Sequence, residues 1–210
     1  MIMKPVLYSF RRCPFAIRAR MALVYSGIRA ELREVNLSAM PGSMLQLSPK
    51  ATVPVLALSN EQVIDESLDI MLWSLSRTDP DQWLDIDETS EQLIQRIDAE
   101  FKPMLDCYKY ADRHPRFSQL EHRARAEVFL SELNRSLSNH PYLNGHRLRL
   151  TDVAIFPFIR QFAGVDPSWF EHCDYASVRS WLNTMLGSDL FQRVMRKNPF
   201  WQPGDAVVYL

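Results

Sequence analysis

The spacing of apolar residues changes near residue 80, and this change restricts the folds that the chain can adopt. Before it, short apolar runs typical of strands alternate with helical patterns, as they do in α/β proteins. After it, apolar residues recur at helical spacing almost throughout. We therefore expect an α/β domain followed by an all-α domain. The expected bounds are 1–78 for the first domain, 79–87 for an acidic, turn-rich linker, and 88–210 for the helical domain.

The first domain is predicted to follow the order β-α-β, a short helix or loop, then β-β-α. Gly27 is placed to end the first helix, because glycine readily adopts the left-handed conformation found after helix C-termini. The expected strands are 5–10, 32–37 (at an edge of the sheet), 53–58 and 62–64, the last two joined as a hairpin around 59–61. The expected helices are 15–26 and 67–76.

The helical domain is predicted from apolar residues that repeat on one face of each helix. We expect a kink at Pro103, because proline has no N–H to donate within a helix. The apolar sets are Ile94, Ile97, Phe101 and Leu105; Val128, Leu130, Leu133 and Leu137; the nearly all-apolar 153–163; and Trp181, Leu182, Met185 and Leu186.

Charge and composition exclude several classes of protein. The chain has 24 Lys and Arg against 25 Asp and Glu, which leaves no overall field for nucleic acid or a membrane surface. No window approaches the roughly 20 apolar residues of a membrane helix, and the first apolar run is too short for a signal peptide. The three cysteines are widely spaced and odd in number, so they form no disulfide framework. We expect a soluble protein of the cytoplasm.

Cys13 precedes Pro14 at the expected start of the first helix. Proline is favoured at the first helical position, and the helix dipole there stabilises a thiolate, which lowers a cysteine pKa from about 8.5. The residue three positions on is Ala16 rather than a second cysteine, so a mixed disulfide at Cys13 needs an outside thiol, for which glutathione is the abundant choice. The residues alone leave a buried, inert Cys13 as an equal alternative. Three nearby arginines add positive charge: Arg11, Arg12 and Arg18.

Two further segments can each be interpreted either as a binding site or as an ordinary structural feature. Pro54 stands at the head of an expected strand, where it either only starts the strand or leaves neighbouring backbone groups to pair with an extended peptide. Glu66 and Ser67 precede a helix, where they either cap it or bind the ammonium and carboxylate groups of a ligand.

Taken together and in order, these motifs resemble the cytosolic glutathione transferase superfamily, and in particular its cysteine-type, omega-like and glutaredoxin-like members. The likeness rests on C-P-F-A at 13–16, T-V-P-V at 52–55 and E-S at 66–67, and the expected order of elements extends it over essentially the whole chain. It implies a thioredoxin-like domain that binds glutathione as cosubstrate and a helical domain that shapes the pocket of the second substrate. It also implies a homodimer.

The resemblance also implies roles for individual residues. Cys13 is the catalytic thiol, and Val53, before a cis Pro54, pairs through its backbone with the cysteinyl part of glutathione. Glu66 and Ser67 bind the γ-glutamyl end. Lys50 binds the glycyl carboxylate, unless it is simply an exposed lysine. Phe15 belongs to the cysteine motif and completes the expected glutathione site.

One position departs from the family pattern. Members usually carry Ser or Thr three residues before the aspartate of the central helix, as part of a capping box, and Arg149 occupies that position here. Asp152 is still expected to brace the loop before the helix through backbone N–H groups, with Thr151 as an alternative cap.

Other residues with possible chemistry are assigned structural roles. Tyr8 is interpreted as strand packing rather than as a catalytic hydroxyl, and Cys107 and Cys173 as core residues. The five histidines show no metal-ligand spacing, so no metal is expected. Trp201 in the apolar tail is a candidate to close the pocket of the second substrate. A set of residues is either the lining of that pocket or core: Phe158, Arg160, Gln161, Phe162 and Trp169.

These features predict a glutathione-dependent thiol transferase or reductase, acting in deglutathionylation or in reduction of a dehydroascorbate-type substrate. One alternative is a transferase that conjugates glutathione to electrophiles. The other is a non-enzymatic interaction protein, such as the stringent-starvation proteins that associate with RNA polymerase; these typically lack the cysteine. No nucleic-acid or membrane partner is expected. The sequence leaves the physiological cosubstrate open.

Overall fold

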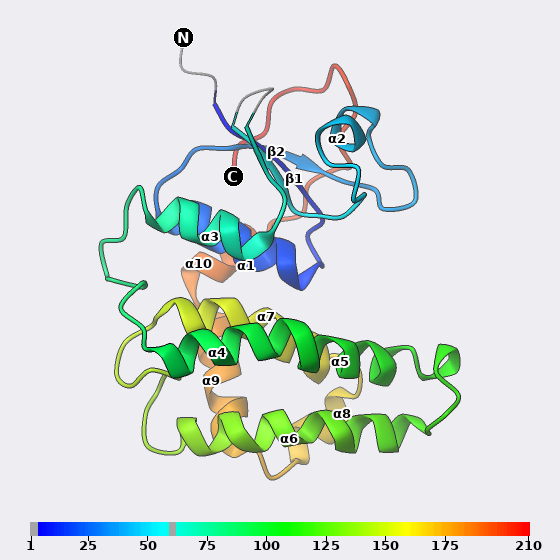
Figure 1. The fold of residues 1–210 in the computed structure, drawn as a ribbon, viewed down its shortest axis with the longest axis vertical. Coiled ribbons are helices and arrows are strands. Elements are labelled where there is room, and N and C mark those ends of the chain that lie inside the picture. The colour runs from blue at the N-terminus through cyan, green and yellow to red at the C-terminus, as the bar shows by residue number, and fades with distance from the viewer. Residues whose placement is uncertain (1–3, 59–61) are drawn as a thin grey trace. The chain divides into compact units, whose positions relative to one another are not determined.

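A computed structural model describes residues 4–58 and 62–210, which form two compact units. The first runs to Asp81 and also includes Ser188–Leu210, and the second is Gln82–Gly187. These bounds differ from the expected domains at the C-terminal end, because 188–210 belong with the first unit rather than with the helical one. The overall class is the predicted one, an α/β unit with a thioredoxin-like sheet and an all-helical unit (Figure 1).

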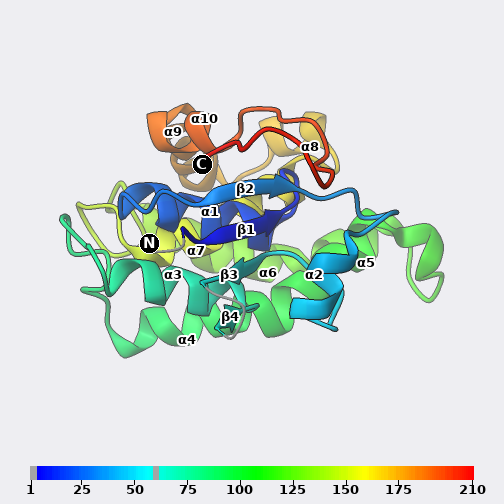
Figure 2. The ribbon, with the colours of Figure 1, turned by 90° about the horizontal axis from the view of Figure 1, so that it is seen from above.

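The first unit is built on a four-stranded mixed sheet in the order β2-β1-β3-β4 (Figure 2). Strand β1 pairs with β2 in parallel and with β3 antiparallel, and β3 pairs antiparallel with β4. The turn expected around 59–61 lies outside the described residues. The strands are β1 (Val6–Ser9), β2 (Glu31–Glu34), β3 (Val55–Ala57) and β4 (Val63–Ile64), and the helices are α1 (Pro14–Tyr25), α2 (Gly42–Leu47) and α3 (Ser67–Leu75).

The two faces of this sheet carry separate apolar cores. Side chains alternate along a strand, so Leu7 and Tyr8 of β1 lie on opposite faces. Leu7 packs with residues of α1 and α3, whereas Tyr8 packs with Met44 of α2 and with the tail. Helix α1 ends as predicted, because Gly27 has φ of +68° and the chain turns there. Helix α1 therefore packs, through Ala19 and Leu23, on the face of the sheet opposite to the Tyr8 side chain.

The C-terminal tail belongs to the first unit because it covers the open edge of β2. Helix α10 (Asp189–Val194) packs on α1, and the chain then runs back along the sheet. Leu32 N–H donates to Val208 O over 2.8 Å, and Trp201 N–H donates to Glu34 O over 2.8 Å. An edge strand presents unpaired N–H and C=O groups, and here the tail pairs with the Leu32 N–H and the Glu34 carbonyl.

The second unit consists of helices. No helix of the described residues is long and apolar enough to cross a membrane. Helices α8 and α10 were not foreseen, since each is only six residues long and offers too few apolar repeats. The helices of this unit are α4 (Glu88–Arg96), the π-helical segment η1 (Ile97–Phe101), α5 (Lys102–Lys109), the 3₁₀ turn η2 (Ala111–Arg113), α6 (Gln119–Leu137), α7 (Leu150–Ala163), α8 (Pro167–His172) and α9 (Ala176–Gly187).

The expected irregularity at Pro103 is present as a π-helical turn. Segment η1 joins α4 to α5 directly before Pro103, which stands in the first turn of α5. Because proline donates no hydrogen bond, the regular α-helical pairing cannot run through this point. One predicted face is partly wrong, because Val128 on α6 is 65% exposed while Leu130 and Leu133 are buried.

The start of α7 retains half of a capping box. Asp152 is buried, and its Oδ2 accepts from the Arg149 N–H over 3.1 Å. The Arg149 guanidinium, which cannot accept a hydrogen bond, instead donates to Gln82 O and pairs with Asp85. The prediction that Thr151 supplies the cap is wrong, because its buried hydroxyl has no hydrogen-bond partner among the described residues.

Candidate functional site

Cys13 stands at the N-terminus of α1, where the chain changes from extended to helical backbone. Its φ and ψ are −72° and 124°, and Pro14 is the first helical residue. The Cys13 N–H donates to Phe10 O, and the Ile17 N–H donates to Cys13 O, both over 2.9 Å. The sulfur atom is therefore carried at the positive end of the helix dipole, by a turn whose backbone is fixed on both sides.

The thiol of Cys13 lies against the segment that precedes β3. It donates to the carbonyl oxygen of Val53 with a sulfur–oxygen distance of 3.6 Å. The Val53–Pro54 peptide bond is cis, as the resemblance implied, and Pro54 is buried. Cys13 and Val53 are 40 residues apart in the chain, so the fold unites the first two motifs at one point.

The arginines around Cys13 have definite structural partners. The Arg11 backbone N–H donates to Glu34 over 2.6 Å, and Arg20 pairs with the same carboxylate over 3.5 Å. Burial raises the pKa of Glu34, while its contacts with Arg11 and Arg20 oppose that rise. Burial also lowers the pKa of Arg20 to about 10. Glu34 thus anchors the turn that presents Cys13. Arg12 lies over the Phe10 ring.

Helix α3 begins with the third motif. Glu66 is the residue before its first turn and is 64% exposed, whereas Ser67 is buried. The Arg18 Nε donates to the Ser67 hydroxyl over 3.0 Å, and the Arg18 guanidinium also lies over the Phe15 ring. A buried cation beneath a serine at a helix N-terminus favours an anion at that position. Arg18 therefore joins α1 to the start of α3.

Lys50 is held by carboxylates beside the same helix start. Its ammonium donates to Glu66 over 2.7 Å and to Asp65 over 3.1 Å. These contacts raise the pKa of Lys50. The pKa of Asp65 is lowered, mainly by a hydrogen bond from the Ser48 hydroxyl and to a lesser extent by Lys50. The two contacts use two of the three N–H donors of the ammonium, so the half-exposed Lys50 can bind a further carboxylate with the third.

Tyr8 and Trp201 lie on the other face of the sheet. The Tyr8 hydroxyl donates to Ser43 over 3.0 Å and accepts from Arg33 over 2.6 Å. The Trp201 ring packs edge-on against Tyr8 with centroids 6.1 Å apart, and Arg33 lies over it. This geometry agrees with Tyr8 as a packing residue. Trp201 is half-buried and packs against the apolar core of the first unit.

The other residues that the sequence analysis considered for the pocket or the core are either buried or half-buried. Phe158 and Phe162 are buried core residues. Cys107 and Cys173 are only half-buried, so the prediction that both are core residues is wrong. Trp169 is half-buried, and Arg123 lies over its ring, 4.2 Å from the centroid. Within 4–58 and 62–210, no three or more His, Cys, Asp or Glu side chains gather as a metal site would require.

Sequence reasoning missed two polar contacts of this site. Arg18 was counted only among the arginines that add positive charge near Cys13, and its contact with Ser67 was not foreseen. Ser48 was not considered, although its hydroxyl donates to Asp65 over 2.7 Å. A helical arginine with apolar neighbours on both sides indicates a buried charge that needs a partner. No signal in the sequence tells which residue that partner is.

Comparisons with known proteins agree with this geometry. A profile of the glutathione S-transferase N-terminal domain matches residues 7–83. Glutathione S-transferase omega-1 of Sus scrofa is 27% identical over 197 residues, which cover 92% of this chain and 77% of that protein. The probable glutathione S-transferase parA of Nicotiana tabacum is 28% identical over 210 residues, which cover 88% of this chain and 86% of that one.

Solved structures share the fold at lower identity. Glutathione transferase Omega 3C from Trametes versicolor has a TM-score of 0.76 at 19% identity, over 94% of this chain and 91% of that one. A glutathione transferase family member from Pseudomonas fluorescens pf-5, solved with two glutathione bound, has a TM-score of 0.77 at 17% identity, over 91% and 92% of the two chains.

Proposed function

This chain is an omega-like member of the cytosolic glutathione transferase superfamily, and we propose that it is a glutathione-dependent thiol transferase with Cys13 as its nucleophile. The observation that carries the proposal is the contact between the Cys13 sulfur and the Val53 carbonyl. This contact places the Cys13 sulfur, a nucleophile at a helix N-terminus, next to the backbone of Val53. An extended peptide can pair with those backbone groups. Glutathione is such a peptide, with a thiol at its centre.

Glutathione is proposed to bind along three groups of this unit. Its cysteinyl residue pairs with the backbone of Val53, next to Pro54 and Phe15. Its γ-glutamyl ammonium binds Glu66, and the α-carboxylate binds the Ser67 hydroxyl and the N-terminus of α3, supported from below by Arg18. In this arrangement the Lys50 ammonium binds the glycyl carboxylate with the N–H donor that Asp65 and Glu66 do not use.

Ionisation of Cys13 prepares the site for this ligand. As a thiol, Cys13 donates to the Val53 carbonyl and so competes with the ligand for that acceptor. A thiolate has no proton to donate, so the carbonyl becomes available to the cysteinyl N–H of glutathione. The helix dipole stabilises the same thiolate. Formation of the nucleophile and pairing of the ligand therefore favour one another.

The proposed reaction consists of two thiol–disulfide exchanges. First, the Cys13 thiolate attacks the glutathione sulfur of a mixed disulfide, which forms a Cys13–glutathione disulfide and releases the other partner as a thiolate that takes up a proton. Next, the thiolate of a second glutathione attacks the glutathione sulfur of that disulfide. This step releases oxidised glutathione and regenerates the Cys13 thiolate. Electrons pass from two glutathione molecules to the original disulfide.

Conjugation of glutathione to electrophiles is less favoured by the site. It needs a donor that stabilises the glutathione thiolate without forming a disulfide with it, and the tyrosine of β1 is the obvious candidate. However, the Tyr8 side chain packs on the face of the sheet opposite to α1, and its hydroxyl is already held by Ser43 and Arg33. The family resemblance further supports the proposals that the protein forms a homodimer and acts in the cytoplasm.

The mixed disulfide of glutathione and 2-mercaptoethanol tests the proposal directly. We expect wild-type protein to reduce it with glutathione, and Cys13→Ser to have no activity above the uncatalysed rate, because a hydroxyl cannot form the mixed disulfide. Cys107→Ser and Cys173→Ser serve as matched controls and should keep full activity. An interaction protein would show no turnover at all. Full activity of Cys13→Ser would contradict the assignment of Cys13.

A further inference from the structure

The turn that carries Cys13 is tied to the neighbouring strand by a side chain. This turn is closed by a hydrogen bond from the Cys13 N–H to Phe10 O. The Arg11 N–H is not used within the turn, and Glu34 Oε1 accepts from it over 2.6 Å. Parallel pairing sets Glu34 of β2 beside Ser9, the last residue of β1. The carboxylate therefore lies where the turn begins and holds its backbone.

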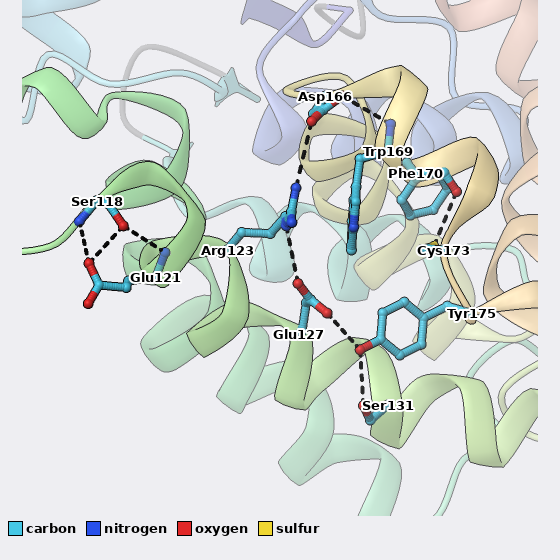
Figure 3. Close-up of polar contacts among 10 residues, drawn as sticks. All are labelled: Ser118, Glu121, Arg123, Glu127, Ser131, Asp166, Trp169, Phe170, Cys173 and Tyr175. Atoms are coloured by element: carbon cyan, nitrogen blue, oxygen red, sulfur yellow. Dashed lines mark hydrogen bonds and ion pairs between the residues drawn. The ribbon is translucent and has the colours of Figure 1, made fainter.

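The cation that faces Glu34 from α1 is poorly satisfied for a buried group. Arg20 is fully buried, and in the part of the chain that the structure describes its one carboxylate partner is Glu34, at 3.5 Å. Its Nε has no hydrogen-bond partner there. Arg123 on α6 shows the contrasting case, because it pairs with Glu127 over 3.2 Å and with Asp166 over 3.6 Å. Figure 3 shows the Arg123 guanidinium between these two carboxylates.

Stability alone does not account for the buried pair of Arg20 and Glu34. Replacement of a buried ion pair by apolar side chains of similar volume is often neutral or stabilising, because the charges no longer lose their hydration on folding. Burial raises the pKa of Glu34 and lowers that of Arg20 to about 10, so it opposes both charges. The second oxygen of this carboxylate is bonded to the Cys13 turn, which points to a role at that turn.

The C-terminal tail is bonded to the same strand residue and to the same turn. The Trp201 N–H donates to Glu34 O over 2.8 Å, and the Arg11 guanidinium donates to Met195 O over 3.5 Å. The tail runs along β2 (Figure 2). Turn, strand and tail thus form a closed set of contacts, in which each of the three is bonded to the other two.

Trp201 is the main anchor of the tail at Glu34. A cavity of about 400 Å³ lies between the tail and β2, and Glu34, Phe200 and Trp201 are part of its lining. The Trp201 ring is held by Tyr8, against which it packs edge-on, and by Arg33, which lies 4.2 Å from its centroid. Phe200 is half-exposed. Loss of the Trp201 ring should therefore loosen the tail at Glu34, and loss of the Phe200 ring should not.

We propose that Glu34 is a positioning residue for Cys13 and that the C-terminal tail acts on Cys13 through it. The carboxylate fixes the turn so that the Cys13 sulfur stays at the N-terminus of α1, where the helix dipole stabilises a thiolate. The Trp201 N–H in turn fixes the strand at Glu34. This inference rests on the proposed thiol transfer and extends it, because it makes the tail a determinant of the reactivity of a thiol near the other end of the chain.

Two double variants test the role of Glu34, because they differ only in the acceptor that they offer to Arg11. Both Arg20→Met/Glu34→Met and Arg20→Met/Glu34→Gln remove the same two charges, so direct charge effects on Cys13 cancel between them. Alkylation of Cys13 by iodoacetamide at pH 6 is quantified by peptide mass spectrometry, with Cys173 as the internal reference. We expect Arg20→Met/Glu34→Met to slow it about tenfold, as the fraction of thiolate falls. Arg20→Met/Glu34→Gln should restore the rate, because its amide oxygen accepts from the Arg11 N–H.

Hydrogen exchange of the Arg11 amide, followed by NMR, reports the hydrogen bond itself. Exchange should be slow in the wild type and in Arg20→Met/Glu34→Gln, and fast in Arg20→Met/Glu34→Met. Trp201→Ala should also speed this exchange and should slow alkylation of Cys13, by less than Arg20→Met/Glu34→Met does. Phe200→Ala is the matched control in the tail and should change neither quantity.

The wild type is measured first, because it separates the two proposals. A Cys13 that reacts as an ordinary thiol in the wild type would overturn the proposed function and this inference with it. With a reactive wild-type Cys13, equal alkylation of Cys13 in the two double variants would overturn the positioning role alone. Unchanged alkylation and exchange in Trp201→Ala would overturn the part assigned to the tail. A general loss of stability does not imitate the expected result, because both double variants lack Arg20.

Discussion

Helices α7 and α3 both begin beside an acidic residue, but the two acidic side chains differ in their partners. Asp152 in α7 is fully buried and accepts from the backbone N–H of Leu143, from that of Arg149 and from the Trp181 indole. Glu66 at α3 is 64% exposed and contacts Lys50, a residue that is itself 52% exposed. The first carboxylate completes the fold, and the second remains accessible to a ligand.

The partners of each carboxylate distinguish a helix N-terminus that stabilises the fold from one that can bind a ligand. At α7, donors on three segments of the protein converge on one carboxylate, so its loss leaves buried groups without partners. At α3, the buried polar contact is the one between Arg18 and Ser67 below the surface, and the exposed carboxylate adds little to stability. Mutations at the two sites should therefore change different measured quantities.

Asp152→Ala should have the largest effect on stability. It removes the acceptor of three donors, two of them in buried contacts. At about 1–3 kcal/mol for each buried donor, we expect the free energy of unfolding in urea to fall by about 2–6 kcal/mol. Asp166→Ala is a matched control, because Asp166 caps α8 by accepting the Trp169 N–H and pairs with Arg123 over 3.6 Å. Its loss should cost about 1–2 kcal/mol. Equal losses in the two variants would contradict the central bracing role of Asp152.

The pH dependence at Asp152 provides a second test of the same region. Burial raises the pKa of Asp152 from 3.8 to about 6, against the effect of its hydrogen bonds. Between these values the folded protein keeps a proton that the unfolded chain releases, so this group lowers stability as the pH rises from about 4 to about 6. The change corresponds to about 3 kcal/mol.

Asp152→Asn removes that titration. The free energy of unfolding of the wild type, relative to this variant, should therefore decrease by up to about 3 kcal/mol between pH 4 and pH 7, and then stay constant. A difference that does not vary with pH would show that burial does not control the ionisation of Asp152.

Glu66→Gln should affect ligand affinity but not stability. The variant keeps the shape of the side chain and loses the charge that is proposed to bind the γ-glutamyl ammonium, so S-methylglutathione should bind about ten- to a hundredfold more weakly by calorimetry. The urea midpoint should hardly change, because the lost ion pair is exposed. Asp69→Asn, an exposed acid in the first turn of α3, is the control. Lost stability with normal affinity would make Glu66 a structural residue like Asp152.

The sequence predicted the elements that carry a strong local signal. Gly27 marks the end of α1, and the apolar run of 153–163 marks α7, because conformational preference and apolar spacing are properties of the chain itself. The tail was assigned to the wrong unit, because its pairing with β2 depends on an open sheet edge distant in sequence. In the candidate site, the motifs located Cys13, Val53 and Glu66. The contact of Arg18 with Ser67 depends on how α1 packs on α3, which no local pattern encodes.

The reactivity of Cys13 tests the account most directly. The rate of its alkylation by iodoacetamide should be measured from pH 5 to pH 9 by peptide mass spectrometry, with Cys107 and Cys173 as internal references. We expect Cys13 to react well below pH 7, as a thiolate stabilised at the N-terminus of α1. With oxidised glutathione, the mass of the protein should increase by one glutathione at Cys13. Alkylation of Cys13 that follows the pH profile of an ordinary thiol, near 8.5, with no glutathione adduct, would contradict the proposed function.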